Sequence, residues 1–251
     1  MANEKEMRFS GEDITPDRLS ALASNPHLEK LVIWGGPVTN DQLEPLRRMP
    51  HLKSLVLGEM PIDDGVFRYI QALPELAYLN LAYTDVEGDF TELAKLPLRD
   101  LRLEGCRRVG DRCARSLTAF PSLRQLEIHM TGLTDDGVQN LASLPLEALW
   151  LGGPITDRGM KAVATMTALK HLDVCCPRVT DEGVRAISTL RGLEVLWLSN
   201  CQITDESLAS LSRLESLREL ALGKTGITPS GRQRLRELLP QCRQVAEDPN
   251  A

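Results

Sequence analysis

Residues 191–214 read RGLEVLWLSNCQITDESLASLSRL, and this stretch decides which fold the whole chain is expected to have. Leu196 and Leu198 alternate with the residues beside them, which is the period of a half-buried β-strand. The pair Thr204-Asp205 follows, a combination that suits the start of a helix, and apolar residues then recur at helical spacing. The stretch therefore predicts a short strand, a turn and a short helix.

The same pattern recurs along nearly the whole chain. Its second leucine, called the key leucine below, returns every 22 to 25 residues. The key leucines are Leu31, Leu55, Leu79, Leu101, Leu126, Leu149, Leu172, Leu196 and Leu220. They define nine repeats over residues 26–239, with an N-terminal partial repeat at 1–25 and a truncated C-terminal cap and tail at 240–251. In these flanking parts, Phe9 is expected in a strand, ITPDRLSAL (14–22) as a helix, and Val245 at the key position.

One such repeat is too small to bury its own apolar face, so repeats of this length must stack. Stacking places the strands side by side as a parallel sheet and the helices on the opposite side. The sequence therefore predicts an α/β solenoid with the sheet on a concave inner face and the helices on a convex outer face. Because the repeats use almost all of the 251 residues, no second domain is expected.

Composition limits the classes of function. The chain has 42 leucines but only 4% aromatic residues, a bias typical of leucine-based repeats. Its net charge of −6 argues against a nucleic-acid partner, which needs a basic surface. No window is apolar enough to span a membrane, and the start MANEKEMRF has no apolar segment of a secretory signal. We therefore expect a cytoplasmic protein.

The repeat resembles the leucine-rich repeat superfamily, and more narrowly its cysteine-containing class, whose units read L-x-x-L-x-L-x-x-C/T-x-I-T-D-x-G. Cys106 and Cys201 occupy the C/T position, as do Thr84, Thr131 and Thr225. The resemblance covers roughly residues 7 to 245 and implies an arc or horseshoe that binds proteins. It is also similar to substrate receptors of ubiquitin ligases, but the segment before the first repeat is too short for an F-box.

Two repeats depart from the pattern. The third reads YTDVEGDFTEL and lacks the T-D-x-G sequence, while the fourth reads CRRVGDRCARSL and carries extra arginines. The simpler interpretation is that the sequences of these two repeats have drifted without functional consequence. The alternative is a local bend or an edge contact near residues 84–115.

Catalytic and metal sites have little support in the sequence. Cys106, Cys113, Cys201 and Cys242 fall at positions that the repeat buries, so reduced buried thiols are expected for them. His171, Asp173 and Cys175 share one strand face, but residues spaced along a strand do not converge on one metal ion. We expect no metal and no cofactor. A thiol enzyme that uses Cys175, which falls on the open face, remains the least favoured alternative.

The inner face carries the most information about function. Positions −1, +1 and +3 from each key leucine point away from the core, and all three tryptophans of the chain fall on them. Tryptophan, tyrosine and arginine are the residues that most often anchor protein interfaces. The candidate partner-binding residues on this face are Trp34, Tyr78, Arg102, Glu127, His129, Trp150, His171, Asp173 and Trp197.

These positions predict a non-enzymatic protein–protein interaction module that binds its partner on the concave face. Charged residues at these positions sum to −3, which favours a partner with a basic or amphipathic surface. Trp150 and Trp197 lie two strands apart with Asp173 between them, so an acidic slot with two indole walls is expected there. The alternative function is a component that recruits a substrate to a multi-protein enzyme complex.

Overall fold

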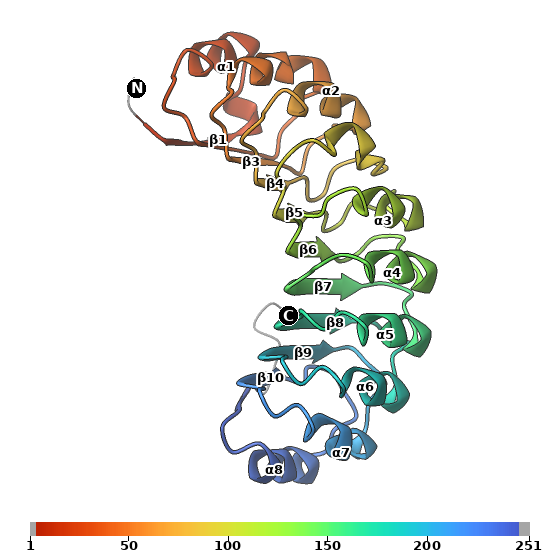
Figure 1. The fold of residues 1–251 in the computed structure, drawn as a ribbon. Helices are drawn as coiled ribbons and strands as arrows, with labels where there is room; N and C mark the ends of the chain where they lie inside the picture. Colours follow the sequence, from red (N-terminus) through yellow and green to blue (C-terminus); the bar gives the residue numbers. More distant parts are fainter. Residues whose placement is uncertain (1–3, 246–251) are drawn as a thin grey trace. The chain divides into compact units, whose positions relative to one another are not determined.

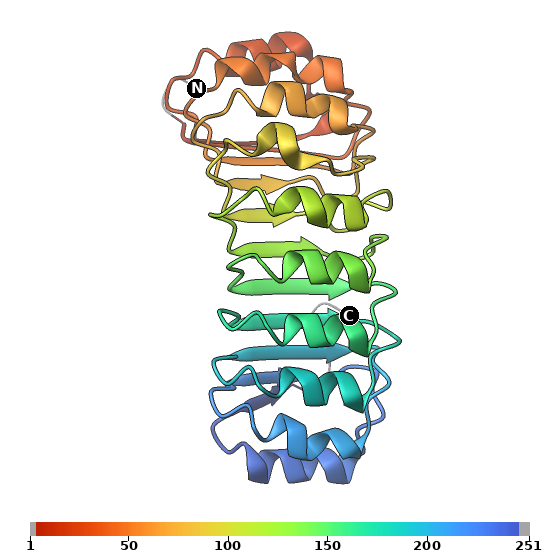
Figure 2. The ribbon, with the colours of Figure 1, turned by 45° about the vertical axis from the view of Figure 1, so that its right-hand side comes forward.

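The computed structural model describes residues 4–245, so residues 1–3 of the expected N-terminal cap and residues 246–251 of the expected tail lie outside it. The chain divides into two compact units, here called the first unit, up to Thr131, and the second unit, from Gly132. In each unit the strands form one layer and the helices another (Figures 1 and 2). That all nine repeats act as one solenoid stays a prediction.

The first unit begins with the expected partial repeat, which confirms Phe9 in a strand and a helix after Thr15. Its parallel strands are β1 (Glu6–Ser10), β2 (Lys30–Trp34), β3 (Ser54–Gly58), β4 (Tyr78–Asn80), β5 (Asp100–Arg102) and β6 (Gln125–Ile128). Its helices are η1 (Gly11–Asp13), α1 (Pro16–Leu22), η2 (Asn40–Arg48), η3 (Asp64–Val66), α2 (Phe67–Ile70), η4 (Phe90–Leu93) and α3 (Asp111–Leu117).

The second unit repeats the same strand–helix order with greater regularity. Its parallel strands are β7 (Ala148–Gly152), β8 (His171–Cys175), β9 (Val195–Ser199), β10 (Glu219–Ala221) and β11 (Arg243–Val245). Its helices are α4 (Asp135–Leu141), α5 (Asp157–Val163), α6 (Asp181–Ile187), η5 (Asp205–Ser207), α7 (Leu208–Leu211) and α8 (Pro229–Leu238). Among residues 4–245, no helix is long and apolar enough to cross a membrane.

The key leucines stand in register across neighbouring strands of each unit. In the first unit Leu31 pairs with Leu55, and Leu55 pairs with Leu79; in the second, Leu172 pairs with Leu196. All nine key leucines are completely buried. Burying a leucine side chain stabilises the fold by roughly 1.5–3 kcal/mol, so this column supplies a large share of the apolar core.

The final strand departs from the expected alignment. Val245 was expected at the key position, but the structure pairs Leu220 with Gln244 and places Val245 opposite Ala221. β11 has only three residues and lies at the end of the sheet, so few hydrogen bonds specify its register. The proline-based alignment of this cap was therefore wrong by one residue.

Several segments expected as α-helices are 3₁₀-helices. The longest is η2, which contains Pro45 in its interior. Proline lacks the N–H that an α-helix would need at that point, and its ring clashes with the preceding turn. The helical side of the first unit is therefore less regular than that of the second.

A ladder of Asp-to-Thr hydrogen bonds links neighbouring repeats in the second unit. The Thr of each T-D pair caps its own helix, as the sequence predicts, since Thr156 Oγ1 accepts from Arg158 N–H. The Asp, however, reaches the next repeat: Asp135 accepts from Thr156 N–H at 2.8 Å and from its hydroxyl at 2.7 Å. The same two bonds join Asp157 to Thr180, Asp181 to Thr204 and Asp205 to Thr228.

The glycine of the T-D-x-G sequence is explained by this ladder. A Cβ added at Gly183 would lie 2.6 Å from Asp157 Oδ1 and 2.9 Å from a methyl group of Val179. Glycine lets the aspartate of the preceding repeat approach closely enough to bond the cap threonine. The ladder has one exception, Ser207, whose hydroxyl donates to Asp181. The T-D-x-G sequence therefore makes contacts between neighbouring repeats in addition to starting a helix.

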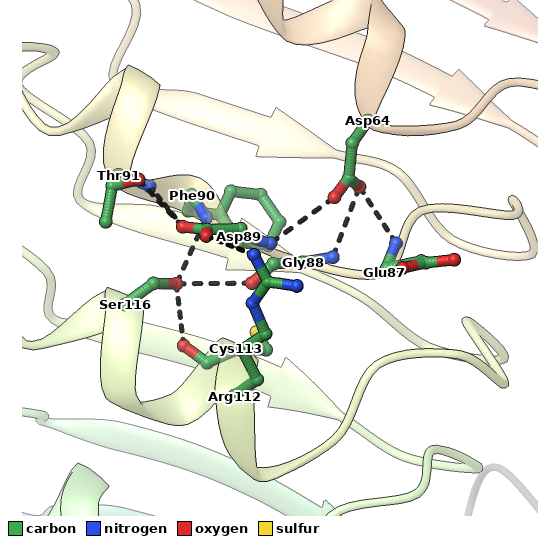
Figure 3. A network of polar contacts seen from close by, with 9 residues as sticks. All are labelled: Asp64, Glu87, Gly88, Asp89, Phe90, Thr91, Arg112, Cys113 and Ser116. Atoms are coloured by element: carbon green, nitrogen blue, oxygen red, sulfur yellow. Dashed lines mark hydrogen bonds and ion pairs between the residues drawn. The ribbon is translucent and has the colours of Figure 1, made fainter.

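The irregular third repeat replaces the ladder with another set of bonds (Figure 3). The Asp64 carboxylate accepts from three consecutive N–H groups, those of Glu87, Gly88 and Asp89, at 2.8, 3.2 and 3.4 Å. Ser116 in α3 donates to the Gly88 carbonyl at 3.2 Å and accepts from Phe90 N–H at 3.1 Å. The departure near residues 84–115 is thus a different way to satisfy the backbone between repeats.

Gly183→Ala is expected to lower the free energy of unfolding by about 1–3 kcal/mol, because the new methyl group must displace Asp157 or Val179 from a packed position. Gly192→Ala is the matched control, since an added Cβ there meets no atom within 4 Å. Urea denaturation of both variants provides the measurement. Equal stability of the two variants would contradict this account of the motif.

Acid is expected to weaken the ladder. Burial alone would raise the pKa of Asp135, but hydrogen bonds from Thr156 and Gly159 outweigh it and lower the pKa below its usual 3.8. The charged form is therefore the one that the folded state favours, so its stabilisation is present above that value and lost as the pH falls through the lowered pKa.

Thermal melting from about pH 7 to about pH 3 should show this loss. Asp135→Asn serves as the control, because it carries no titrating group at this position. The difference in melting temperature between the native chain and this variant should shrink as the pH falls. A difference that stays constant down to the acid limit would show that the Asp135 charge does not stabilise the fold.

Candidate functional site: the strand faces

The strand face of a unit is defined here as the side of its strands that is turned away from the helices. Of the nine candidate residues, those in the first unit are Trp34, Tyr78, Arg102, Glu127 and His129. Those in the second unit are Trp150, His171, Asp173 and Trp197. The structure groups them in three places, which are described in turn.

A hollow of about 510 Å³ lies on the strand face of the first unit and is called the first-unit hollow below. Val32 and Val56 from neighbouring strands give it an apolar floor, while Trp34 and Tyr78 supply aromatic surface. The complete lining is Arg8, Lys30, Val32, Trp34, Ser54, Val56 and Tyr78. The hollow can therefore receive an apolar side chain beside two aromatic rings.

One edge of the hollow is basic. Arg8 on β1 and Lys30 on β2 both lie beside Glu6, with nitrogen–oxygen distances of 2.6 and 3.2 Å. The hydrogen bond from Arg8, followed by that from Lys30, lowers the pKa of the Glu6 carboxyl. Arg8 is not among the residues that the leucine pattern predicts on the strand face. It lies on β1, which precedes the first key leucine, so the pattern does not assign the register of that strand.

Arg102, Glu127 and His129 form a polar cluster within the first unit. Arg102 donates to Asp100 at 2.7 Å and to Glu127 at 2.8 Å, and His129 Nδ1 lies 3.8 Å from Glu127. Burial opposes the charges on Arg102 and Glu127, but their hydrogen bonds outweigh it, so the pKa of Arg102 is raised and that of Glu127 lowered. Because these charges are already paired with one another, they would contribute less to the electrostatic attraction of a partner.

The second unit stacks three rings across its strand face. The His171 ring lies between two indoles, with its centroid 4.6 Å from that of Trp150 and 5.1 Å from that of Trp197. Trp197 Nε1 donates to Glu219 at 3.1 Å. Asp173 pairs with both tryptophans in the strand register, yet only 3% of its surface is exposed.

The acidic slot expected at this place is therefore absent. His171 was expected on the same strand, but a pattern of positions does not show that its imidazole ring lies between the two indoles. All three rings of the stack are half-buried, and Asp173 is buried.

The cysteines are mostly core residues. Cys106, Cys113, Cys176 and Cys201 are buried, whereas Cys175 and Cys242 are half-buried. Burial raises the pKa of the Cys106 thiol and raises that of Cys201 to about 11, so both stay protonated near neutral pH. Cys242 was expected to be buried, but the short terminal strand leaves it half-covered, and burial still raises its pKa to about 11.

Within residues 4–245, no three His, Cys, Asp or Glu side chains form a group that could hold a metal ion. Cys175 lies at the end of β8, opposite Gly152 on one side and Ser199 on the other. Neither neighbour is a general base, which a thiol nucleophile needs.

A second kind of residue escaped the sequence analysis entirely. Tyr83 and Met130 follow strands of the first unit at position +4 from the key leucine, and both are exposed. Their φ angles are +58° and +53°, in the left-handed region, which costs an L-residue roughly 1–2 kcal/mol. The signal in the sequence was available: glycine occupies the same position in other repeats, at Gly35, Gly105 and Gly153.

Comparison with known proteins supports the fold. The sequence model of the Leucine Rich Repeat family matches residues 192–214. No curated protein matches the chain. Among solved structures, an internalin (inlF) from Listeria monocytogenes is similar, with 19% identity and a TM-score of 0.52; the similarity covers 97% of this chain and 87% of that one. Internalin C2 (inlC2) from the same species is also similar, with 18% identity and a TM-score of 0.58. That similarity covers 86% of this chain and 84% of the internalin C2 chain.

The ring stack generates a stability prediction. Trp197→Ala removes a half-buried ring and one hydrogen bond, so it is expected to lower the free energy of unfolding by about 1–2 kcal/mol. Leu172→Ala, at a completely buried key leucine, should cost about 2–5 kcal/mol. Chemical denaturation of both variants measures the two losses. If Trp197→Ala proved as costly as Leu172→Ala, the ring would have to be counted as core.

Proposed function

We propose that this chain, which has the fold of leucine-rich repeat proteins, is a non-enzymatic module that binds a partner protein through its strand faces. A leucine-rich repeat fold alone supports protein interaction only in general terms. The more specific proposal concerns which surface binds and what kind of partner it fits.

The first-unit hollow is the observation that carries this proposal. It combines an apolar floor with two aromatic residues, and 38% of the Trp34 surface is exposed. Aromatic residues in a partly enclosed apolar setting are the usual anchors of protein interfaces, because burying them gains much apolar area. The four strands β1 to β4 hold these side chains, so little conformational entropy remains to be lost on binding.

The charges around the hollow favour an amphipathic partner. Arg8 and Lys30 already contact Glu6, so the basic edge is partly neutralised. The Arg102 cluster is likewise compensated internally. An apolar side chain in the hollow, with polar groups around it, therefore fits better than a strongly charged partner of either sign.

The cytoplasm is the compartment we propose. Four thiols are buried in the apolar core, where they pack as small apolar side chains, and Cys106 Sγ donates to the Leu81 carbonyl. Their protonated state at neutral pH is compatible with a reducing compartment. Alkylation of the chain isolated from its native cell, without prior reduction, tests this directly.

Tyr78→Ala is the variant that tests the binding surface. The partner would first be captured from native lysate with the unmodified chain, and its affinity for each variant would then be measured by calorimetry. Loss of the ring should weaken binding by about 2 kcal/mol, since Tyr78 lines the hollow and is only half-buried by its own chain.

Lys95→Ala, an exposed position on the helical side of the same unit, is the control and should bind normally. Melting temperatures of both variants separate binding from folding. Unchanged affinity in a folded Tyr78→Ala variant would contradict the proposed site.

A further inference from the structure

A row of side chains follows the carboxyl ends of the strands in the first unit and is called the edge row below. It consists of Trp34, Glu59, Tyr83 and Met130, which are exposed, and Glu104, which is half-buried. Of the four large apolar side chains that are exposed among residues 4–245, three belong to this row: Trp34 at 38%, Tyr83 at 42% and Met130 at 56%. Exposed apolar residues grouped in this way mark an interaction surface.

The backbone holds the row at regular spacing. Glu59 N–H donates to the Ala82 carbonyl at 2.9 Å, Tyr83 N–H to the Glu104 carbonyl at 2.7 Å, and Gly105 N–H to the His129 carbonyl at 3.0 Å. These bonds continue the sheet ladder by one to three residues beyond the strands. Neighbouring members of the row therefore lie about one strand spacing apart, roughly 4.8 Å.

Tyr83 and Met130 adopt a conformation that disfavours their own side chains. Both have φ in the left-handed region, where glycine and asparagine are the favoured residues. In the second unit the residues that adopt this conformation at the same position are Gly153, Asn200 and Lys224, while Cys176 at the fourth such position is buried and does not adopt it. Bulky apolar residues in strained, exposed positions point to a function that compensates their cost to folding.

Hydrogen bonds and close packing fix the two aromatic rings. Trp34 Nε1 donates to Glu59 at 2.8 Å, and Tyr83 Oη donates to Glu104 at 2.6 Å. The rings meet edge to face, with centroids 6.5 Å apart. The Trp34 ring lies against Gly58 and the Tyr83 ring against Gly105, so closely that an added Cβ would overlap either ring.

The charge on the row is negative. Glu59 and Glu104 accept hydrogen bonds from neutral rings, and within residues 4–245 neither carboxylate forms a salt bridge. The hydrogen bond to Glu104, together with burial, raises the pKa of Tyr83 to about 12, so its hydroxyl stays a donor. Two carboxylates at the polar edges of the two rings attract a cation by charge.

We propose that the edge row binds an extended segment of a partner protein in which an aromatic or aliphatic side chain stands next to lysine or arginine. The apolar side chain packs against Trp34, Tyr83 and Met130. The cationic side chain lies on Glu59 and Glu104. This surface shares Trp34 with the first-unit hollow but extends away from it through Tyr83, Glu104 and Met130, and the proposal rests on the proposed function only in taking a protein as partner.

The probe is a random short-peptide library displayed on phage and selected against the full chain at low ionic strength. The selected peptides should share an apolar residue beside lysine or arginine, and a synthetic peptide of that consensus is then titrated by calorimetry. A consensus rich in acidic residues, or no consensus at all, would overturn the proposal.

Tyr83→Asn is the central variant. Asparagine tolerates the left-handed conformation, so the melting temperature should stay close to that of the native chain while the apolar surface is lost. The dissociation constant should rise about thirtyfold or more, the effect of removing an interface hot spot. Lys224→Asn is the matched control, because it makes the same change at the same turn position of the second unit. Equal affinity of the two variants would refute the proposal.

Glu104→Gln tests the charge. Glutamine can still accept the Tyr83 hydroxyl, so the ring stays in place while one negative charge is removed. Affinity should fall about tenfold, and the affinity of the native chain should itself fall as salt is added. A Glu104→Gln variant that binds as tightly as the native chain would show that no cation lies there.

Tyr78→Ala separates this inference from the proposed function. If it abolishes peptide binding while Tyr83→Asn does not, the peptide occupies the hollow, and the edge row is not the site. Sedimentation of the native chain tests the remaining occupant, a second copy of the chain. A dimer that Tyr83→Asn converts to a monomer would also overturn the proposal in favour of self-association.

Discussion

The hydrogen bonds between an aspartate and the cap threonine of the next repeat are the constraint on which the second unit depends. Each aspartate satisfies a backbone N–H and a hydroxyl at a helix start that would otherwise have to face solvent. Because the acceptor belongs to one repeat and the donors to the next, the bonds fix the distance between repeats. The residue beside them is glycine, or in one repeat Ser207, whose hydroxyl itself donates to the aspartate.

This spacing determines what the strand faces present. When successive repeats are locked in register, residues at the same position form columns, and the columns bring together side chains that are 22 to 25 residues apart in the sequence. The first-unit hollow, the Arg102 cluster and the ring stack at His171 all arise in this way. Where a column contains opposite charges they neutralise one another, and where it contains apolar or aromatic residues these lie together on the strand face.

The turn that follows each strand adds a second surface. Its left-handed residue is glycine in three repeats and a larger side chain in five others, including Tyr83 and Met130. A larger side chain at this place is held outward at the end of the sheet, because the backbone on either side is bonded to the next repeat. The first unit therefore has two adjoining surfaces, the hollow and the edge row, which meet at Trp34.

The sequence by itself determined the repeat, the strand and helix order, and the burial of all nine key leucines, because a period of about 24 residues with alternating leucines permits few other structures. It also identified Trp34 and Tyr78 as surface residues. Only the tertiary structure decided that His171 fills the gap between two indoles, that Arg102 is neutralised by Asp100 and Glu127, and that β11 is shifted by one residue. These outcomes depend on side-chain length and on contacts across repeats, and a pattern read along a single strand contains neither.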